Sequence, residues 1–320
     1  MILFSYGTRP EWIKIKPLVE ALDPKKYHIL FTGQHKDLIQ GNSYDFCIDI
    51  QEGKNRLDSV FKSVMDSIDF TPYAKVVVQG DTASAAAVAL SAFNHNCPVV
   101  HLEAGLRTYN LDHPYPEEAY RQIISRITSL HLCPTNLAKE RLIREMVSGK
   151  IAVVGNTALD NLVGIETSYG DEIIITMHRR ENHVWMSEWV REFEMLRNLG
   201  LKVTMINHPN PNVQDALLNV QHINVIDPLS HDEMMKRLAS CKFIITDSGG
   251  LQEEGSFFNK RIIVCRETTE RSEAMVAHSV LCTRPKGLFD ICKNINDDYI
   301  VSEPCPFGDG NATEKIMELL

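Results

Sequence analysis

Short apolar runs recur along the whole chain, each about as long as a buried strand, and helical patterns lie between them. Runs that stay apolar over several residues are typical of strands covered on both faces, as in parallel sheets. Strands that alternate with helices predict an α/β fold whose parallel sheets are doubly wound. The expected strands are residues 2–6, 27–32, 76–78, 98–100, 130–132, 151–154, 173–176, 203–206, 223–226, 243–246 and 261–264.

The alternation pauses at a short polar segment, residues 166–171, and then restarts. We therefore predict two domains, residues 1–165 and 166–305, because 320 residues are enough for two separate cores. A C-terminal segment, residues 306–320, is expected to end in a helix. The other clear helical patterns are residues 11–22, 57–68 and 184–199 and the Ala-rich stretch between 78 and 98.

Composition disfavours several functions. The net charge of −9 argues against binding to nucleic acid or to an anionic membrane. The 8 cysteines include no Cys-x-x-Cys, so neither a metal site nor a disulfide framework is indicated, and a cytoplasmic protein is expected. Met1 leads directly into a strand-like run, so no signal peptide is expected, and no apolar run reaches the ~18 residues of a membrane span. No P-loop or Gly-x-Gly-x-x-Gly motif follows a strand, so no nucleotide cofactor is expected.

Three carboxylates in the first half follow strands or open a helix. Asp81 follows the strand at 76–78, Glu103 follows the strand at 98–100, and Glu117 opens a later helix. In open α/β sheets the ligand site lies at the carboxyl ends of the strands, so these residues are expected to share a pocket. Each has a simpler alternative: Asp81 as a helix N-cap, and Glu117 as a first-turn carboxylate favoured by the helix dipole.

In the second half, the segment Ser248-Gly249-Gly250 leads from a strand into a helix. Backbone N–H groups at such a helix start can bind a phosphate or diphosphate, and Glu254 one turn later could accept hydrogen bonds from a ribose. The alternative is a tight turn with a capping serine. Basic or imidazole groups that could complete an anion site lie at strand ends or in the first helix. The simpler alternative is that each of them is an ordinary surface or structural residue. They are Arg9, Lys14, His178, Arg179, His208 and Arg271.

Taken together, the motifs resemble the UDP-N-acetylglucosamine 2-epimerases, specifically their non-hydrolysing branch, over nearly the whole chain. The matching segments, in order, are residues 7–11, 80–82, 101–108, 116–118, 155–157, 178–182, 247–254, 268–273 and 307–310. The resemblance implies a glycosyltransferase-B type fold, with two Rossmann-like domains facing across a cleft and the last helix packing back on the first domain. It places most catalytic groups in the first domain and most of the UDP site in the second.

The implied reaction inverts carbon 2 of the sugar: UDP is eliminated to give a 2-acetamidoglucal and is then re-added. It interconverts UDP-N-acetylglucosamine and UDP-N-acetylmannosamine without a cofactor, and a homodimer is expected. Positions matching the proton-transfer groups are Asp81, Glu103, Glu117 and His208, with acid and base unassigned. Positions matching the UDP-sugar site are Arg9, Lys14, His178, Arg179, Ser248, Gly249, Gly250, Glu254 and Arg271.

The sequence also departs from the family pattern. The chain is short between Leu162 and Ile173, and Asn207 replaces the usual valine before the histidine. Family members use a second substrate molecule as an activator. Of that regulatory site Gln34 matches, but Asp37 replaces a glutamine and Lys54 replaces an arginine. Lysine is a point charge that cannot grip a diphosphate bidentately, so activation is expected to be weak or missing.

Other functions remain open on the sequence. A hydrolysing 2-epimerase, which releases UDP and N-acetylmannosamine, is one alternative. A glycosyltransferase-B enzyme that transfers the sugar from a UDP-sugar is another, but no acceptor site can be identified. A sugar-nucleotide sensor without catalysis would not need Asp81, Glu103, Glu117 and His208 together.

Overall fold

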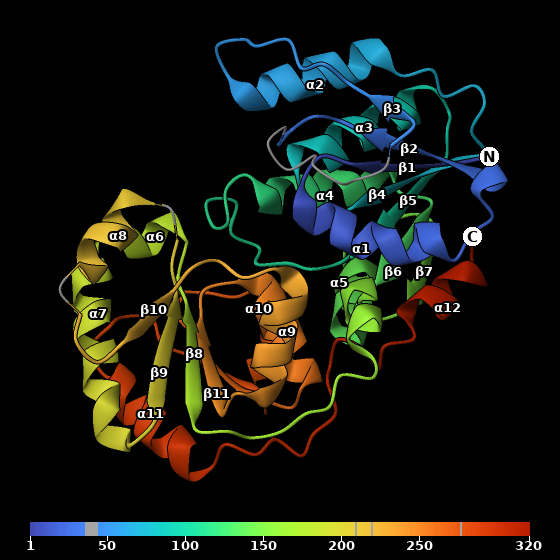
Figure 1. Cartoon of the computed structure of the whole chain (residues 1–320). Coiled ribbons are helices and arrows are strands. Elements are labelled where there is room, and N and C mark those ends of the chain that lie inside the picture. Colours follow the sequence, from blue (N-terminus) through green and yellow to red (C-terminus); the bar gives the residue numbers. More distant parts are fainter. Residues whose placement is uncertain (36–43, 209, 219, 276) are drawn as a thin grey trace. The chain divides into compact units, whose positions relative to one another are not determined.

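The computed structural model describes residues 1–35, 44–208, 210–218, 220–275 and 277–320 (Figure 1). The chain forms two compact units. Unit 1 contains Met1–Asn161 and Gly308–Leu320, and unit 2 contains Leu162–Phe307. The sequence placed the corresponding boundaries at 165 and 305. Each unit is built on a parallel sheet with helices on both faces, which confirms the predicted fold class.

Unit 1 has a seven-stranded parallel sheet in the order β3-β2-β1-β4-β5-β6-β7. The order reverses between β1 and β4, and such a switch point is where open α/β sheets bind ligands. Its strands are β1 Ile2–Tyr6, β2 Tyr27–Phe31, β3 Phe46–Cys47, β4 Lys75–Gln79, β5 Val99–Leu102, β6 Leu130–Cys133 and β7 Lys150–Val153. Its α-helices are α1 Arg9–Glu20, α2 Arg56–Ser67, α3 Ala83–Asn94, α4 Glu117–Ile127, α5 Asn136–Arg144 and α12 Ala312–Met317.

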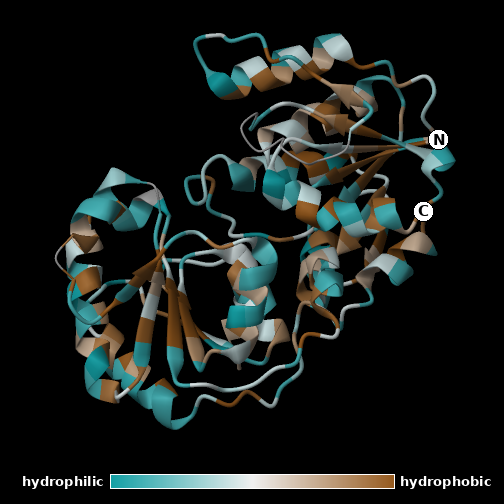
Figure 2. Cartoon of the chain, viewed as in Figure 1, coloured by the Kyte–Doolittle hydropathy of each residue, from teal (hydrophilic) through white to brown (hydrophobic). Residues whose placement is uncertain are grey.

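The core of unit 1 lies on both faces of this sheet, because the strands are apolar at successive residues. Val76 and Val78 of β4 pack in one cluster with the alanines of α3, while Val77 packs in the opposite cluster with α1. Figure 2 shows the hydrophobic strands in the interior and helices with one polar face. Ile316 of α12 is buried in the α1 cluster, and Asp160 accepts hydrogen bonds from the first backbone N–H groups of α12. The C-terminal helix is therefore part of unit 1.

Unit 2 has a six-stranded parallel sheet in the order β10-β9-β8-β11-β12-β13, with its own switch point between β8 and β11. Its strands are β8 Glu172–Thr176, β9 Lys202–Ile206, β10 Asn224–Ile226, β11 Phe243–Thr246, β12 Arg261–Val264 and β13 Ser279–Leu281. Its α-helices are α6 Arg180–His183, α7 Met186–Met195, α8 Pro211–Leu217, α9 His231–Ser240, α10 Gly249–Phe257 and α11 Leu288–Asp297.

One predicted helix is wrong in its extent. The pattern at 184–199 reads as a single helix, but α6 ends at His183, α7 begins at Met186, and a 3-10 turn spans Leu196–Leu199. Trp185 has non-helical dihedrals at the N-cap of α7, and Gly200 in the left-handed region ends the segment. Apolar spacing continues across such a break because Trp189 and Phe193 still face the core.

Among the described residues, no helix is both long and apolar enough to cross a membrane.

Candidate active site

The first group of predicted site residues lies at the switch point of unit 1. The turn after β1 contains Thr8, the turn after β4 contains Asp81, and Glu103 follows β5 directly. Because β4 pairs with both β1 and β5 in parallel, these turns lie at one edge of the sheet. The carboxylates of Asp81 and Glu103 are thus brought to the same edge, as the sequence predicted.

Glu103 is held by two polar side chains from different elements. Lys14 Nζ forms an ion pair with Glu103 Oε2, and Gln79 Nε2 donates a hydrogen bond to the same oxygen. The Glu103 backbone has a φ of 68°, a left-handed conformation that is unfavourable for a residue with a Cβ atom. Such strain persists only where the surroundings fix it, and it clusters at functional sites. Lys14 therefore contacts a carboxylate and is not a solvated surface lysine.

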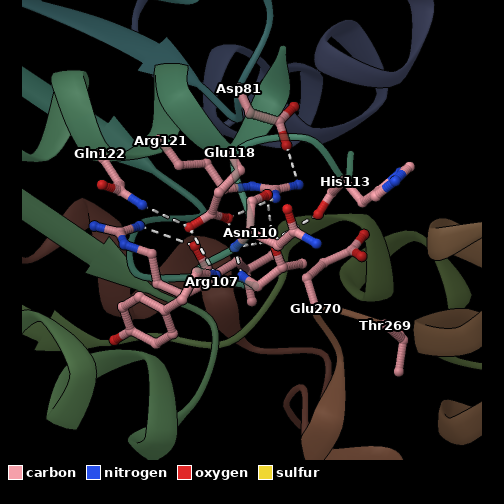
Figure 3. A network of polar contacts seen from close by, with 12 residues as sticks. Asp81, Arg107, Asn110, His113, Glu118, Arg121, Gln122, Thr269 and Glu270 are labelled. Carbon is pink, nitrogen blue, oxygen red and sulfur yellow. Dashed lines mark hydrogen bonds and ion pairs between the residues drawn. The ribbon is translucent and has the colours of Figure 1, made fainter. Parts of the chain in front are cut away.

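Asp81 is not the N-cap of the following helix, so the simpler interpretation of this residue is wrong. Thr82 caps α3, because its hydroxyl accepts a hydrogen bond from the Ala85 backbone N–H at 3.0 Å. Asp81 Oδ2 instead forms an ion pair with Arg121 Nη2 of α4, and the Asp81 side chain stays 26% exposed (Figure 3). The Asp81 carboxylate is fixed but can still be reached by a ligand.

The turn that carries Asp81 rests on a buried histidine. His101 Nε2 lies 2.8 Å from the Gly80 carbonyl oxygen, and the His101 side chain has no solvent exposure. Burial lowers the pKa of His101 to about 3, so the ring is neutral and donates its Nε2 proton to that carbonyl. His101 is therefore a structural support for the turn.

The start of α4 holds two adjacent glutamates with different surroundings. Glu117, the predicted site residue, is the first residue of the helix and is half-buried. Glu118 is fully buried and accepts hydrogen bonds from the backbone N–H groups of Thr108 and Tyr109 at 2.9 and 3.1 Å. Glu117 also fits the alternative of a first-turn carboxylate, and its location at a helix N-terminus suits an ionised carboxylate.

A buried glutamate in the first turn was not predicted as a site residue. Glu11 is 1% exposed and accepts hydrogen bonds from Gly7 N, Thr8 Oγ1 and Thr82 Oγ1 at 3.0, 2.7 and 2.8 Å. It thereby joins the turn after β1 to the turn after β4. Burial raises the pKa of Glu11 to about 7 although these hydrogen bonds oppose the shift. The neighbouring Arg9, predicted to bind UDP, is exposed at the start of α1.

The second group of predicted residues lies at the switch point of unit 2, and Asp247 organises it. Asp247 follows β11, has no exposure, and accepts hydrogen bonds from the backbone N–H groups of His178 and Arg179 after β8. Asn182 Nδ2 donates to the same carboxylate at 3.0 Å. Burial alone would raise the pKa of Asp247, but the hydrogen bonds, led by that from the His178 ring, whose Nδ1 lies 3.1 Å from Asp247 Oδ1, hold it below its ordinary value.

His178 and His208 lie beside one another after neighbouring strands β8 and β9. Their ring centroids are 6.0 Å apart, and both residues line a mostly apolar pocket of about 290 Å³ with Pro228, Leu229 and Ser248. Burial, and then the electrostatic effect of the neighbouring His178, lowers the pKa of His208. The backbone N–H of Asn210 donates to His208 Nδ1, so the neutral ring carries its proton on Nε2. A flat apolar group such as a nucleobase suits this pocket.

The start of α10 is shaped to bind an anion. Ser248 is the N-cap residue and makes no side-chain capping bond, and Gly249 and Gly250 are the first two helical residues. A Cβ atom on Gly249 would lie 2.6 Å from Arg271 Nη1, so only glycine lets the guanidinium pack against the helix start. The Ser248 N–H donates to Thr246 Oγ1 at 3.0 Å, and the N–H groups of Gly249 and Gly250 in the first turn of α10 are suited to bind an anion.

Two predicted binding residues, one in α10 and one packed against its start, contact other side chains. Glu254 of α10 is buried, and its Oε1 lies 3.2 Å from His231 Nε2. Arg271 is 6% exposed, and its Nε donates to Glu253 Oε1 at 2.7 Å while Nη1 pairs with Glu270. The Arg271 charge is thus balanced within unit 2 and supports the start of α10.

The predicted regulatory residues lie in unit 1. Gln34 Oε1 accepts hydrogen bonds from the backbone N–H and hydroxyl of Ser84 at 3.0 and 2.7 Å. Lys54 is exposed before α2, and the guanidinium that reaches the Gln34 segment belongs to Arg56, which donates to the carbonyls of Gly33 and Gln34. Asp37 lies outside the described residues.

Over residues 1–35 and the other described ranges, no cluster of three His, Cys, Asp or Glu residues could hold a metal ion.

Sequence reasoning missed several residues that position the site. They are Glu11, Gln79, Glu118, Arg121 and Asp247. Gln79 and Asp247 end or follow buried strands, so the rule that placed Asp81 and Glu103 could have found them. Arg121 and Glu118 could not be found in this way, because their partners come from distant segments.

Comparison with known proteins agrees with this geometry. The UDP-N-acetylglucosamine 2-epimerase family model matches residues 21–320. A UDP-N-acetylglucosamine 2-epimerase of Campylobacter jejuni is 35% identical over an alignment 373 positions long, which covers 100% of this chain and 97% of that protein.

Solved structures give the same result. The UDP-N-acetylglucosamine 2-epimerase of Neisseria meningitidis, bound to UDP-N-acetylglucosamine, matches with a TM-score of 0.88 and 28% identity over 99% of this chain and 98% of that one. MurG of Acinetobacter baumannii matches with a TM-score of 0.61 and 11% identity over 99% and 98%, which shows only the shared glycosyltransferase-B type fold. The resemblance predicted from the motifs is confirmed: the chain belongs to the UDP-N-acetylglucosamine 2-epimerase family.

Proposed function

We propose that this protein interconverts UDP-N-acetylglucosamine and UDP-N-acetylmannosamine by eliminating UDP to a 2-acetamidoglucal and adding it back. The observation that supports this most strongly is the arrangement around Glu103. A strained glutamate fixed by Lys14 and Gln79 directly follows β5, next to the turn after β4 that carries Asp81. A reaction that moves protons at carbon needs carboxylates held in this way.

The chemistry balances without an electron acceptor. Removal of the proton from carbon 2 supplies the electron pair of the new carbon 1–carbon 2 double bond. The bond between carbon 1 and the diphosphate oxygen breaks, and its electron pair leaves on UDP. Re-addition reverses both changes with a proton delivered to the other face of carbon 2.

Inversion requires proton-transfer groups on both faces, because one base alone would return the proton to the face it came from. The groups proposed for this role are Asp81, Glu103, Glu117 and His208. A neutral His208 whose Nε2 carries the proton is suited to donate to the departing or returning diphosphate. Which group removes the carbon 2 proton and which delivers it stays open between the carboxylates.

Unit 2 is proposed to bind the nucleotide. The apolar pocket beside His178 and His208 suits the uracil ring, and the Ser248 hydroxyl with the N–H groups of Gly249 and Gly250 suits the diphosphate. Glu254 of the same helix, whose carboxylate is paired with His231, is proposed to accept hydrogen bonds from the ribose hydroxyls. Developing negative charge on the diphosphate would be stabilised there, with Arg179 as a further cation.

We also propose that the protein acts as a homodimer in the cytoplasm. All 8 cysteines are free, and the seven apart from Cys47 are at least partly buried, which suits a reducing compartment. Light scattering on the purified full chain measures the oligomeric state, and a mass of one chain contradicts the dimer.

The test is proton NMR of the enzyme with UDP-N-acetylglucosamine in D2O. UDP-N-acetylmannosamine should accumulate to an equilibrium mixture, and both sugar nucleotides should carry deuterium at carbon 2. Release of UDP with free N-acetylmannosamine would identify a hydrolysing enzyme instead. Epimerisation without deuterium at carbon 2 would contradict the elimination route.

A further inference from the structure

We propose that Arg121 is a positioning residue for Asp81, and that Glu118 is the second counter-ion that keeps Arg121 compensated while Asp81 carries a proton. The inference rests on the proposed function, since it takes Asp81 as a proton-transfer group. It adds two residues that touch neither the sugar nor UDP. Figure 3 shows the three side chains in one network of polar contacts.

Arg121 places one guanidinium between two carboxylates. Its Nη2 forms an ion pair with Asp81 Oδ2, and its Nη1 lies 3.4 Å from Glu118 Oε2. The Arg121 side chain is only 6% exposed, whereas that of Asp81 is 26% exposed. The guanidinium is therefore more buried than the carboxylate with which it pairs. Asp81 is the member of this pair that a substrate reaches more easily.

Glu118 is fixed independently of Arg121. Its carboxylate has no exposure and accepts the backbone N–H groups of Thr108 and Tyr109 and the amide of Gln122, at 2.9, 3.1 and 3.0 Å. Three donors from the protein thus hold this carboxylate in place even without the guanidinium. Arg121 sits on a rigid anion and in turn fixes the orientation of Asp81.

The arrangement matters for charge balance. Whenever Asp81 carries a proton during the reaction, it is neutral and Arg121 loses that anionic partner. A buried cation without a partner is costly, and this cost would raise the barrier to proton transfer. Because Glu118 remains beside it, the guanidinium stays compensated through the whole cycle. Asp81 can then change its charge without forcing Arg121 to move.

A double-mutant cycle tests whether Arg121 acts through Asp81. Arg121→Ala should lower kcat by about 10²-fold, the scale of a small misplacement of a catalytic group, with KM and UDP affinity little changed. The same substitution in an Asp81→Asn background should cost less than about twofold, because the group it positions is already gone. If the loss of kcat in the double variant equals the product of the losses in the two single variants, the proposal is wrong.

Chemical rescue separates positioning from a general effect on folding. Added guanidinium should restore part of the activity of Arg121→Ala, whereas the neutral isostere urea at the same low-millimolar concentration should not. Neither compound should raise the activity of Asp81→Asn/Arg121→Ala. Rescue by urea, or equal rescue of the double variant, contradicts a role through Asp81. If Arg121→Ala does not fold, Arg121→Lys replaces it in the double-mutant cycle. A smaller loss of kcat is then expected, because an ammonium keeps the positive charge but cannot contact two carboxylates with a planar guanidinium.

The charge-balance role has its own variant and control. Glu118→Gln keeps the shape of the side chain but removes the anion, so kcat should fall while UDP affinity stays unchanged. Arg126→Met on the same helix, whose exposed guanidinium donates to the Glu145 carbonyl, should leave kcat unchanged. Full activity of both Arg121→Ala and Glu118→Gln overturns the inference. A wild-type enzyme that does not epimerise contradicts the proposed function instead.

Discussion

Glu11 should make the stability of this protein fall as pH rises from 5 to 8. Burial raises the pKa of this glutamate in the folded chain from 4.5 to about 7. Between these two values the folded chain holds a proton that the unfolded chain has released. The folded state is therefore favoured at the acidic end of the window, and this contribution is lost as pH rises through 7.

The size of the effect follows from the shift. One pKa unit corresponds to about 1.4 kcal/mol, so folded and unfolded values of about 7 and 4.5 give a loss of about 2.5 kcal/mol between pH 5 and pH 8. Glu11→Gln cannot titrate. Its amide oxygen can accept from Gly7 N and Thr8 Oγ1, and its NH2 group can donate to the Thr82 hydroxyl, so the contacts of Glu11 are kept.

The assay is urea unfolding of the full chain and of Glu11→Gln at pH 5 and pH 8, followed by circular dichroism. The wild type should lose about 2.5 kcal/mol more of its unfolding free energy than the variant over this interval. Glu20→Gln, an exposed glutamate on the same helix, serves as the control and should behave as the wild type does. Equal losses in the wild type and Glu11→Gln would refute the reasoning, because the buried carboxyl would then ionise without cost.

The remaining predictions concern acid stability, catalysis, binding and regulation. Burial lowers the pKa of His101 to about 3, so protonation favours the unfolded chain as pH falls below 6.5. The unfolding free energy should drop by about 1 kcal/mol more in the wild type than in His101→Gln between pH 7 and pH 5.5, and equal urea midpoint shifts would contradict this. Loss of any one of the proposed proton-transfer groups should lower kcat by at least ~10²-fold, while the UDP affinity measured by calorimetry should change little. The variants are Asp81→Asn, Glu103→Gln, Glu117→Gln and His208→Ala. Ser248→Ala and Glu254→Gln should instead weaken UDP binding, and an equal loss of UDP affinity in both sets would erase the division between the units. Finally, the reverse reaction started from UDP-N-acetylmannosamine alone should proceed without a lag, whereas a lag removed by a trace of UDP-N-acetylglucosamine would show an intact activating site.

Much of the fold could be predicted because its signals are local. The strands at 2–6, 243–246 and 261–264 have the predicted bounds, and the other predicted strands differ by one or two residues at an end. Edge strands were missed: β3 has two residues and β13 has three, too few for a clear apolar run. Helix α11 was also missed. The break between α6 and α7 was hidden because apolar spacing continues across it.

The sequence by itself determined which residues end the central strands, and thus that Asp81, Glu103, His178, His208 and Ser248 would lie at the carboxyl edges of two parallel sheets. That conclusion needs only the apolar pattern and the polarity of parallel strands. The strand order, in which β1 lies beside β4 and β8 beside β11, was not readable from it.

Only the tertiary structure decided what each of these groups contacts. Asp81 pairs with Arg121, Glu103 with Lys14, and the Asp247 carboxylate holds the turn of His178, across separations of 40 to 89 residues. Contacts between such distant segments depend on how the helices pack on the sheets, because this packing decides which polar side chains are buried next to one another. Local patterns carry no signal for that choice, because a buried charge takes whichever partner the fold brings to it.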